Sequence, residues 1–257
     1  MAKIPPRDHR ANRLIAALEP ADFAVLEPHL EIVDLPKGAV LYEAGDSIRY
    51  TYFPHDAIVS LVEVMEDGRV AEVSLFGREG VFGLLSAFIS GEALGRSVVL
   101  VSGTASRIPI KQMRRVLVLR SRLRRMVAAF NEALLAQTFH TMACNTLHPV
   151  EARCCRWLLN THDRMDQDTL PLTHETLAER LGVQRSTVSI VLRTLQTTGL
   201  IEQRRGGIVV ADRAALEQAT CECYHKIRIR VETASPVGLG ILYRDRAGGY
   251  VLGSRRW

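Results

Sequence analysis

Short runs of alternating apolar and polar residues fill the chain from about residue 29 to residue 108. Turn residues separate the runs, and Asp67-Gly68 between two of them is typical of a hairpin, because such tight turns need positive φ angles. The predicted strands cover residues 31–35, 39–42, 57–64, 70–75, 97–101 and 104–108. Many short strands at this spacing indicate a small barrel, jelly roll or sandwich. A short helical lead is expected before them, over residues 1–28.

The hydrophobic period becomes helical after Pro109 and continues to about Thr146 without a glycine or proline. One small β domain cannot cover a helix of this length, so we expect it to pack against a copy of itself as a dimer seam. An ordinary helix that covers the barrel is the alternative. The apolar stripe expected at the seam comprises Met126, Phe130, Leu134 (or Ala133), Gln137 and Thr141.

Residues 172–197 are predicted to form two helices joined by a short turn. Thr173 is a suitable N-cap for the first helix, and Gly182 suits the left-handed conformation that ends it. The second helix, expected over residues 184–197, has Val188, Val191, Leu192 and Leu195 on its inner face. This pattern is typical of a helix-turn-helix. The outer face comprises Arg185, Ser186, Ser189, Ile190 and Arg193. It has no acidic residue, and an acid there would repel phosphate.

Two short apolar runs after Gly199 flank the turn Arg204-Arg205-Gly206-Gly207, which predicts a β-hairpin with a basic tip, a wing. Residues 184–213 contain five arginines and two acids, a net charge of +3. Together with the glycine turn and the apolar spacing, this charge favours DNA binding over a bare helical hairpin.

The whole chain of 257 residues has an ordinary globular balance, with 47% hydrophobic and 24% charged residues. Its net charge of +5 permits a nucleic-acid partner without requiring one. Apolar runs are too short to span a membrane and the N-terminus lacks a signal-peptide core, so a cytoplasmic location is expected. A basic run between Pro109 and Met126 is interpreted as a solvated face, with phosphate contact as the alternative: Lys111, Arg114, Arg115, Arg120, Arg122, Arg124 and Arg125.

The five cysteines are expected to be free thiols, with Cys154 and Cys155 packing as small apolar side chains. Cys221-x-Cys223-x-His225 does not have zinc-finger spacing, and no second pair lies nearby in the sequence. His140 and His148 beside Cys144 are interpreted as a coincidence of composition. We therefore expect no metal site and no cofactor. No recognisable catalytic arrangement is present either, so we expect no catalytic residues and no enzyme.

The succession of strands, long helix and winged helix-turn-helix resembles the Crp/Fnr (cyclic AMP receptor protein) superfamily over residues 12–215. The segment from Gly182 to Ser189 matches the family's recognition-helix entry. The turns Lys37-Gly38 and Ala44-Gly45-Asp46, with residues 77–83, resemble those of the cyclic-nucleotide-binding roll. The resemblance implies an α+β protein with an N-terminal β-roll (a cyclic-nucleotide-binding-like jelly roll), a long dimerisation helix and a C-terminal winged helix-turn-helix.

The resemblance also implies boundaries and partners. We expect a sensor over residues 12–114, a dimerisation helix over 115–146, a DNA-binding domain over 147–215 and a disordered tail over 232–257. The implied function is transcription regulation by a homodimer on a two-fold operator in double-stranded DNA, with RNA polymerase and a small effector as further partners and no membrane. The alternative is a stand-alone small-ligand-binding or protein-interaction module without specific DNA binding.

The expected DNA contacts fall into two classes. Arg185, Ser186, Ser189 and Ile190 are predicted to face the bases, and Arg185 can donate two hydrogen bonds to one guanine. The predicted phosphate contacts are Thr173, Thr187, Arg193, Arg204 and Arg205. In place of the family's common Arg-Glu-x-x-x-Arg, this chain has Arg185-Ser186-x-x-x-Ile190. The operator is therefore expected to differ from the family's best-known one.

The effector pocket implied by the resemblance comprises Gly83, Leu84, Arg96 and Ser97. Arg96-Ser97 matches the pair that holds the cyclic phosphate. Leu84 stands where the family has a glutamate, and a leucine cannot accept a hydrogen bond from the ribose hydroxyl. Cyclic AMP is therefore not the expected effector. The oxygen-sensing branch of the family holds an iron–sulfur cluster through cysteines near the N-terminus, but the first cysteine here is Cys144, so those ligands are missing. Haem sensing is the alternative that stays open. The sensor-domain histidines are His29 and His55, and both are expected at the surface.

Overall fold

The computed structural model describes residues 8–84, 86–87, 90–233, 243–244 and 250–251. The chain divides into two compact units, each described by itself below. The first comprises Met1–Ser60 and Phe76–Ala128, and the second comprises Leu61–Leu75 and Ala129–Trp257. Among the described residues, no helix is long and apolar enough to cross a membrane.

The strands of the roll form two sheets, in the orders β1-β7-β3 and β2-β6-β4-β5, and β7 is antiparallel to both β1 and β3. They are β1 (Glu31–Leu35), β2 (Val40–Tyr42), β3 (Tyr50–Pro54), β4 (Ile58–Val64), β5 (Val70–Phe76), β6 (Arg96–Val101) and β7 (Gly103–Pro109). The six predicted strands and the Asp67-Gly68 turn, where Gly68 has positive φ, are confirmed. Strand β3 was missed because four of its five residues are buried, so its sequence shows no alternation.

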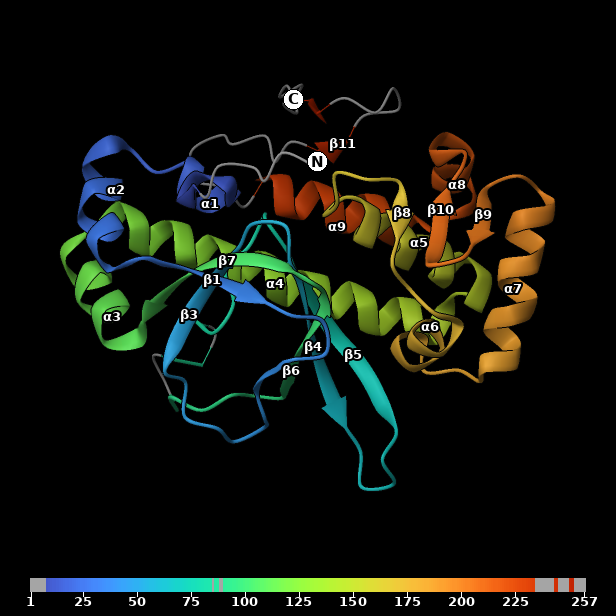
Figure 1. Cartoon of the computed structure of the whole chain (residues 1–257), viewed down its shortest axis with the longest axis horizontal. Helices are drawn as coiled ribbons and strands as arrows, with labels where there is room; N and C mark the ends of the chain where they lie inside the picture. Colours follow the sequence, from blue (N-terminus) through green and yellow to red (C-terminus); the bar gives the residue numbers. More distant parts are fainter. Residues whose placement is uncertain (1–7, 85, 88–89, 234–242, 245–249, 252–257) are drawn as a thin grey trace. The chain divides into compact units, whose positions relative to one another are not determined.

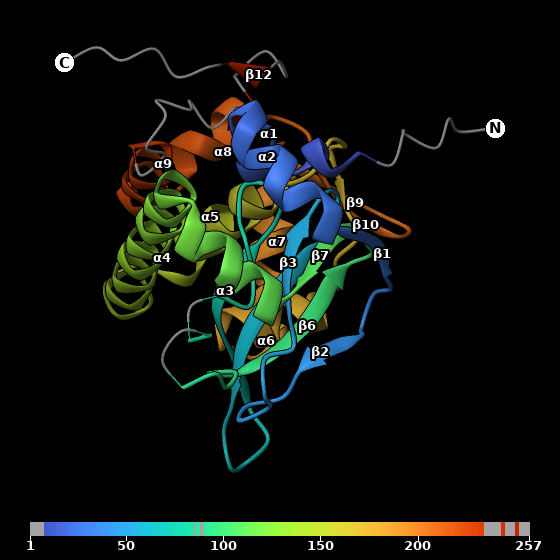
Figure 2. The same cartoon turned by 90° about the vertical axis from the view of Figure 1, so that its left-hand side faces the viewer.

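Strand β7 is the central strand of the first sheet, as Figure 2 shows. Glu31 of β1 lies opposite Arg107, and Tyr52 of β3 lies opposite the same residue. A cluster of aromatic rings fills the interior beside this sheet, and the Tyr52 and Phe82 rings stack with their centroids 5.6 Å apart. The cluster also includes Tyr42, which contacts both rings. These aromatic side chains fill the interior of the roll, which is therefore a packed core.

From residue 8 onward the predicted N-terminal lead is confirmed as short helices: η1 (His9–Ala11), α1 (Arg13–Ala16), α2 (Pro20–Leu26) and η2 (Glu27–His29). Its residues 1–7 lie outside the described part of the chain. Buried Asn12 holds it in place. Its side-chain oxygen caps α1, and its amide nitrogen donates to the carbonyls of Pro54 and Gly80, each at 2.9 Å. One polar side chain thus joins the lead to the roll without leaving a buried polar group unsatisfied.

The helix expected from residue 115 onward is two helices, α3 (Ile110–Leu119) and α4 (Ser121–Leu147). Arg120 between them is extended, with φ −119° and ψ 90°. Its guanidinium lies 3.8 Å from Asp22, and Arg122 forms an ion pair with Glu19 at 2.7 Å. These contacts with α2 set the break, which no glycine or proline marks in the sequence. They also show that part of the basic run is paired with acids rather than only solvated.

The stripe predicted to form the seam is wrong. Met126, Leu134 and Gln137 are buried inside this chain, and the Gln137 amide donates to the Ser74 hydroxyl at 3.3 Å. The exposed apolar side chains of α4 form another stripe, which the sequence could not distinguish from the buried one because both have helical spacing. It comprises Leu135, Phe139 and Met142.

The second unit contains the predicted helix-turn-helix and wing, which Figure 1 shows gathered together. The elements of this unit that follow α4, called the winged unit below, are α5 (Val150–His162), β8 (Thr169–Leu170), α6 (His174–Leu181), α7 (Arg185–Thr197), β9 (Ile201–Arg204), β10 (Gly207–Val210), α8 (Arg213–Ala219) and α9 (Glu222–Thr233). Helices α8 and α9 were not predicted. Strands β11 (Tyr243–Arg244) and β12 (Tyr250–Val251) pair with each other, and most of the predicted tail, 232–257, lies outside the described residues.

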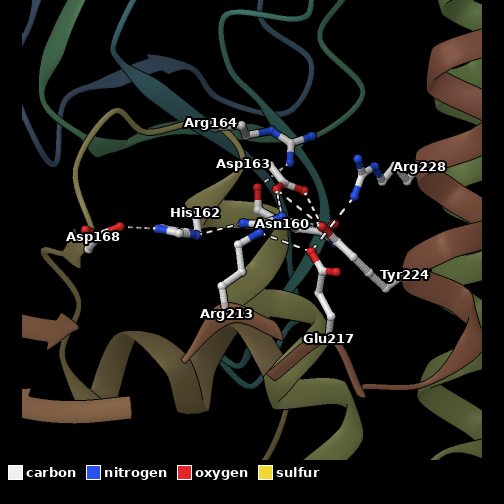
Figure 3. Close-up of polar contacts among 9 residues, drawn as sticks. All are labelled: Asn160, His162, Asp163, Arg164, Asp168, Arg213, Glu217, Tyr224 and Arg228. Atoms are coloured by element: carbon white, nitrogen blue, oxygen red, sulfur yellow. Dashed lines mark hydrogen bonds and ion pairs between the residues drawn. The ribbon is translucent and has the colours of Figure 1, made fainter. Parts of the chain in front are cut away.

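A buried polar network joins α5, α8 and α9 (Figure 3). The Arg213 guanidinium lies 2.5 Å from Asp163 and 3.1 Å from Glu217, and it donates to the Tyr224 hydroxyl at 2.8 Å. Burial alone would lower the pKa of Arg213, but the charge of Asp163 and its other partners raise it. Burial raises the pKa of Tyr224. The network fixes α9 against α5 and α8.

Candidate nucleic-acid interface

The helix-turn-helix is held together by the predicted cap and turn. The Thr173 hydroxyl oxygen accepts a hydrogen bond from the Thr176 N–H at 3.1 Å. Gly182 adopts the left-handed conformation, with φ 64° and ψ 40°, which a side chain would disfavour. The Val183 N–H then bonds to the Ala178 carbonyl at 3.0 Å, which completes the turn. The apolar faces meet below it, with Leu177, Val188, Leu192 and Leu195 fully buried.

Most predicted DNA contacts lie on the outer face of α7. Arg185, Ser186 and Arg193 are exposed, and Ile190 is 66% exposed. Thr187 and Ser189 are half-buried. An exposed isoleucine has no packing role within the described chain, so it is free to contact another molecule. The structure thus gathers Arg185, Ser186, Ile190 and Arg193 on one accessible surface.

His174 is a residue that the sequence reasoning missed. Its Nδ1 lies 2.9 Å from the Ser189 hydroxyl and its Nε2 lies 2.7 Å from the Gln203 side-chain oxygen. The Ser189 hydroxyl also donates to the Arg185 carbonyl at 3.0 Å. One imidazole therefore joins the start of α6, the outer helix α7 and the wing. Only its place directly after the Thr173 cap could have drawn attention to it.

The exposed arginines differ in their acidic neighbours. The Arg185 Nε lies 3.5 Å from Glu175 of α6, with both side chains mostly exposed. Arg204 forms a closer ion pair with Glu202, with its Nε 2.8 Å from the carboxylate. Arg205 at the wing tip has no acidic partner among the residues that the structure describes. The positive charge at the wing tip is therefore carried mainly by Arg205.

Arg213 does not belong to this surface. The predicted net charge of the segment counted it, but its side chain is only 9% exposed and is paired with Asp163 and Glu217. Its charge stabilises the α5–α8–α9 network and is not available to a phosphate. The basic surface is therefore formed by four arginines: Arg185, Arg193, Arg204 and Arg205.

Comparison with known proteins agrees with this geometry. Residues 152–219 match the family model described as "Crp-like helix-turn-helix domain", and residues 32–118 match the "Cyclic nucleotide-binding domain". The two matches fall on the winged unit and on the roll, in the order predicted from the sequence. The chain belongs to the Crp/Fnr family of transcription regulators.

Individual Crp/Fnr relatives match most of this chain. The global nitrogen regulator of Synechococcus elongatus is 26% identical over 200 residues, which cover 74% of this chain and 89% of the relative. A CRP-like cAMP-activated global transcriptional regulator of Mycobacterium tuberculosis is 22% identical over 206 residues, covering 77% and 92%. FixK2 from Bradyrhizobium japonicum shares the fold with a TM-score of 0.66 at 19% identity, covering 75% of this chain and 98% of FixK2.

The predicted effector residues of this Crp/Fnr regulator have little free polar surface. Leu84 and Ser97 are each about 1% exposed. Gly83 has positive φ and packs so tightly against the Tyr50 carbonyl that a β-carbon would collide with it. Arg96 is occupied by Glu43, with its Nη2 and Nε 2.7 and 2.9 Å from the carboxylate oxygens. An anionic ligand at Arg96 would have to compete with that carboxylate.

The expected surface position of His55 is wrong, whereas His29 is exposed. His55 is buried, and its Nε2 lies 2.7 Å from the Ser106 hydroxyl. Burial lowers the pKa of His55. Its hydrogen bonds to Ser106 and Thr104 satisfy both ring nitrogens, so it is a structural residue of the roll.

The five cysteines of this regulator are free and buried. Cys154 and Cys155 pack in the core as expected, and burial raises the pKa of Cys155 to about 12. The other three do not follow the sequence interpretation, because Cys144, Cys221 and Cys223 form one cluster of buried residues. His148 lies beside them, whereas His225 is exposed and contacts the Tyr224 ring.

Proposed function

We propose that this Crp/Fnr regulator binds a two-fold operator in duplex DNA as a homodimer, with α7 in the major groove. The observation that carries the proposal is the exposed face of α7, with Arg185 near its N-terminus and no acid of its own. In helix-turn-helix proteins the N-terminal residues of the second helix contact base edges. Arg185 is therefore the main base-reading residue, and Ser186, Ser189 and Ile190 add weaker contacts.

The flanking residues are proposed to contact phosphate. Arg193 lies further along α7, and Arg204 and Arg205 lie at the wing tip. Thr173 and Thr187 place a hydroxyl near the start of each helix, although the Thr173 oxygen also caps α6. These contacts fix the orientation of the protein on the duplex without reading its sequence.

The dimer is proposed to form along α4. Leu135, Phe139 and Met142 follow one another at spacings of four and three residues, so they share one helix face. Phe139 is 58% exposed and Met142 is 65% exposed in the single chain. A second copy is the occupant that fits, because two identical half-sites require two copies related by a two-fold axis.

The β-roll is proposed to be a sensor for a small effector other than cyclic AMP. The Mycobacterium tuberculosis relative is named as cAMP-activated, but here Leu84 lacks the acceptor and Arg96 is paired with Glu43. A regulator with a DNA partner acts in the cytoplasm, where RNA polymerase is its further partner. We propose no enzymatic role and no catalytic residues.

Selection of bound sequences from a random duplex library tests the proposal. The full-length protein should enrich an inverted repeat whose half-sites are one helical turn apart, about 34–36 Å. Affinity for the selected duplex should fall steeply as salt rises, because phosphate contacts release counterions. A protein that enriches no sequence and shows no salt-dependent binding would instead be a ligand-binding or interaction module.

A further inference from the structure

Four side chains that are far apart in the sequence meet in the second unit. Cys144 lies in the last turns of α4, His148 follows that helix, and Cys221 and Cys223 lie at the start of α9. The Cys144 and Cys221 sulfurs are 3.4 Å apart although the residues are separated by 77 positions. The His148 Nδ1 is 3.7 Å from the Cys223 sulfur. All four ligand atoms lie within 4.8 Å of one another.

The separations of 3.4 and 3.7 Å are close to the edges of a tetrahedron around one ion, and none of the others exceeds 4.8 Å. With Zn–S distances of about 2.3 Å, two thiolates on the same tetrahedral zinc lie about 3.8 Å apart, and a sulfur and an imidazole nitrogen lie slightly closer. An iron–sulfur cluster would place several irons and sulfides between its ligands and spread them further apart. The spacing therefore suits a single ion, and three sulfurs with one nitrogen are a ligand set of structural zinc.

The surroundings of His148 provide a second observation. Its Nδ1 faces the sulfurs, and its Nε2 lies 3.2 Å from the Glu222 carboxylate. A histidine that ligates a metal usually donates its other ring N–H to a carboxylate, which fixes the tautomer and orients the ring. Glu222 thus holds His148 in the orientation that leaves Nδ1 free to ligate.

The charges around the cluster also suit a metal site. One divalent zinc with three thiolates carries a net charge of −1, which is costly in a buried place without a compensating group. Arg156 of α5 is only 4% exposed, and its positive charge acts on both Cys144 and Cys221. It supplies the compensating charge from the protein interior.

The two cysteines of α9 are held in place before any ion binds. Tyr224, next to Cys223, is fully buried, and its hydroxyl contacts Arg213 and Asp163 of the network in Figure 3. This anchor fixes the first turn of α9, and a preorganised set of ligands binds a metal more tightly than a mobile one.

We propose that Cys144, His148, Cys221 and Cys223 bind one zinc ion in a closed, structural site. The three thiols release their protons to solvent as the ion binds, and no oxidation or reduction is involved. Four protein ligands leave no open position for a substrate, so the ion's role is to join the end of α4 to the start of α9. The sequence hid the site, because Cys221-x-Cys223 is completed by residues about 75 positions away.

Metal analysis of the full-length protein tests the proposal directly. The protein, purified under reducing conditions without chelator, should contain one zinc ion per chain when its metal content is measured by inductively coupled plasma mass spectrometry. Replacing zinc with cobalt should give the visible absorption of a tetrahedral cobalt thiolate. Absence of zinc together with failure of the metal-free protein to bind added zinc would overturn the proposal. So would a Cys144–Cys221 disulfide in the reduced preparation, found by mass spectrometry of peptides.

Matched variants assign the ligands. Cys221→Ser and His148→Ala should lose most of the zinc, whereas Cys154→Ala and His225→Ala should keep it, because neither control residue belongs to the cluster. Glu222→Gln should keep the site but weaken zinc affinity by about 10–100-fold in a chelator competition. Unchanged zinc content in Cys221→Ser or His148→Ala would place the ion elsewhere. Operator binding is measured in parallel, so an unmutated protein that neither contains nor takes up zinc but still binds DNA refutes the zinc site and leaves the proposed function intact.

Discussion

The outer face of α7 and the predicted effector residues of the β-roll hold their polar side chains in different ways. On α7, Arg185 and Arg193 project from a helix whose other face is buried, and they remain exposed. In the roll, Ser97 is buried and Arg96 is bound by Glu43. The two regions therefore differ in how easily their charged side chains can bind an anion. Arg185 has only a loose ion pair with Glu175, at 3.5 Å, whereas Arg96 is held by Glu43 at 2.7 and 2.9 Å and must leave that carboxylate to receive an anion.

The difference shows what each region requires of its partner. Duplex DNA is a large anion that attracts exposed arginines over a distance, and it needs only a surface of the right shape. A small anionic effector at the predicted pocket must instead displace the Glu43 carboxylate from Arg96. DNA binding should therefore respond strongly to single substitutions, and cyclic AMP should have little effect.

The largest effect is expected from Phe139→Asp. A charge in the middle of the exposed stripe of α4 should prevent the second copy from packing, so light scattering should show monomers. Operator affinity should then fall about 10²–10⁴-fold, because the second DNA-binding unit no longer adds its contacts. Phe139→Leu, which keeps an apolar side chain, should remain dimeric. A wild-type protein that is monomeric at micromolar concentration would contradict the proposed seam.

The next largest effect is expected from Arg185→Ala. Loss of the bidentate contact to a guanine should weaken binding to the selected operator by about 1–3 kcal/mol and relax that base position. Arg185→Lys should keep the charge but still lose discrimination, because an ammonium lacks the planar fork. Library selection with each variant is the measurement. An unchanged sequence motif with Arg185→Ala would assign base reading to another residue.

The sequence predicted the helices and strands of the helix-turn-helix and wing better than the side-chain contacts of their functional residues. The α6–α7 turn was predicted because cap, glycine and apolar spacing are local features, and Thr173 and Gly182 adopt the expected conformations. Strand β3, the break at Arg120 and the helices α8 and α9 depend on packing between distant segments. The cluster of Cys144 with Cys221 and the contacts of His174 are of the same kind, since their partners are set by the fold.

Helix α4, the proposed dimer helix, is an example of a surface that only the fold defines. Helical spacing marks every apolar stripe of α4, but only the fold decides which one this chain covers. Met126 and Leu134 pack inside the chain, and Phe139 does not. A substitution chosen from the sequence alone, such as Phe130→Asp, would have altered a half-buried position and confused folding with assembly.

A smaller effect distinguishes the two arginines of the wing. Arg205→Ala should reduce the slope of log affinity against log salt by about one unit, because one phosphate contact is lost. Arg204→Ala should change the slope less, because Glu202 already neutralises much of its charge. Both losses should be similar on selected and random duplexes, measured by fluorescence anisotropy at several salt concentrations. A loss confined to the selected operator would mean that the wing reads bases.

The smallest effect is expected from cyclic AMP. A ligand at about 100 times its Kd would stabilise the folded protein by about 2.7 kcal/mol, which raises the thermal midpoint by several degrees in a chain of this size. We expect no measurable rise with cyclic AMP at about 100 μM, because Leu84 offers no acceptor and Glu43 occupies Arg96. The Mycobacterium tuberculosis relative named as cAMP-activated is the positive control. A clear rise in this protein would show that the Arg96–Glu43 pair opens for the nucleotide. The roll would then differ from α7 only in needing this opening step before it binds its ligand.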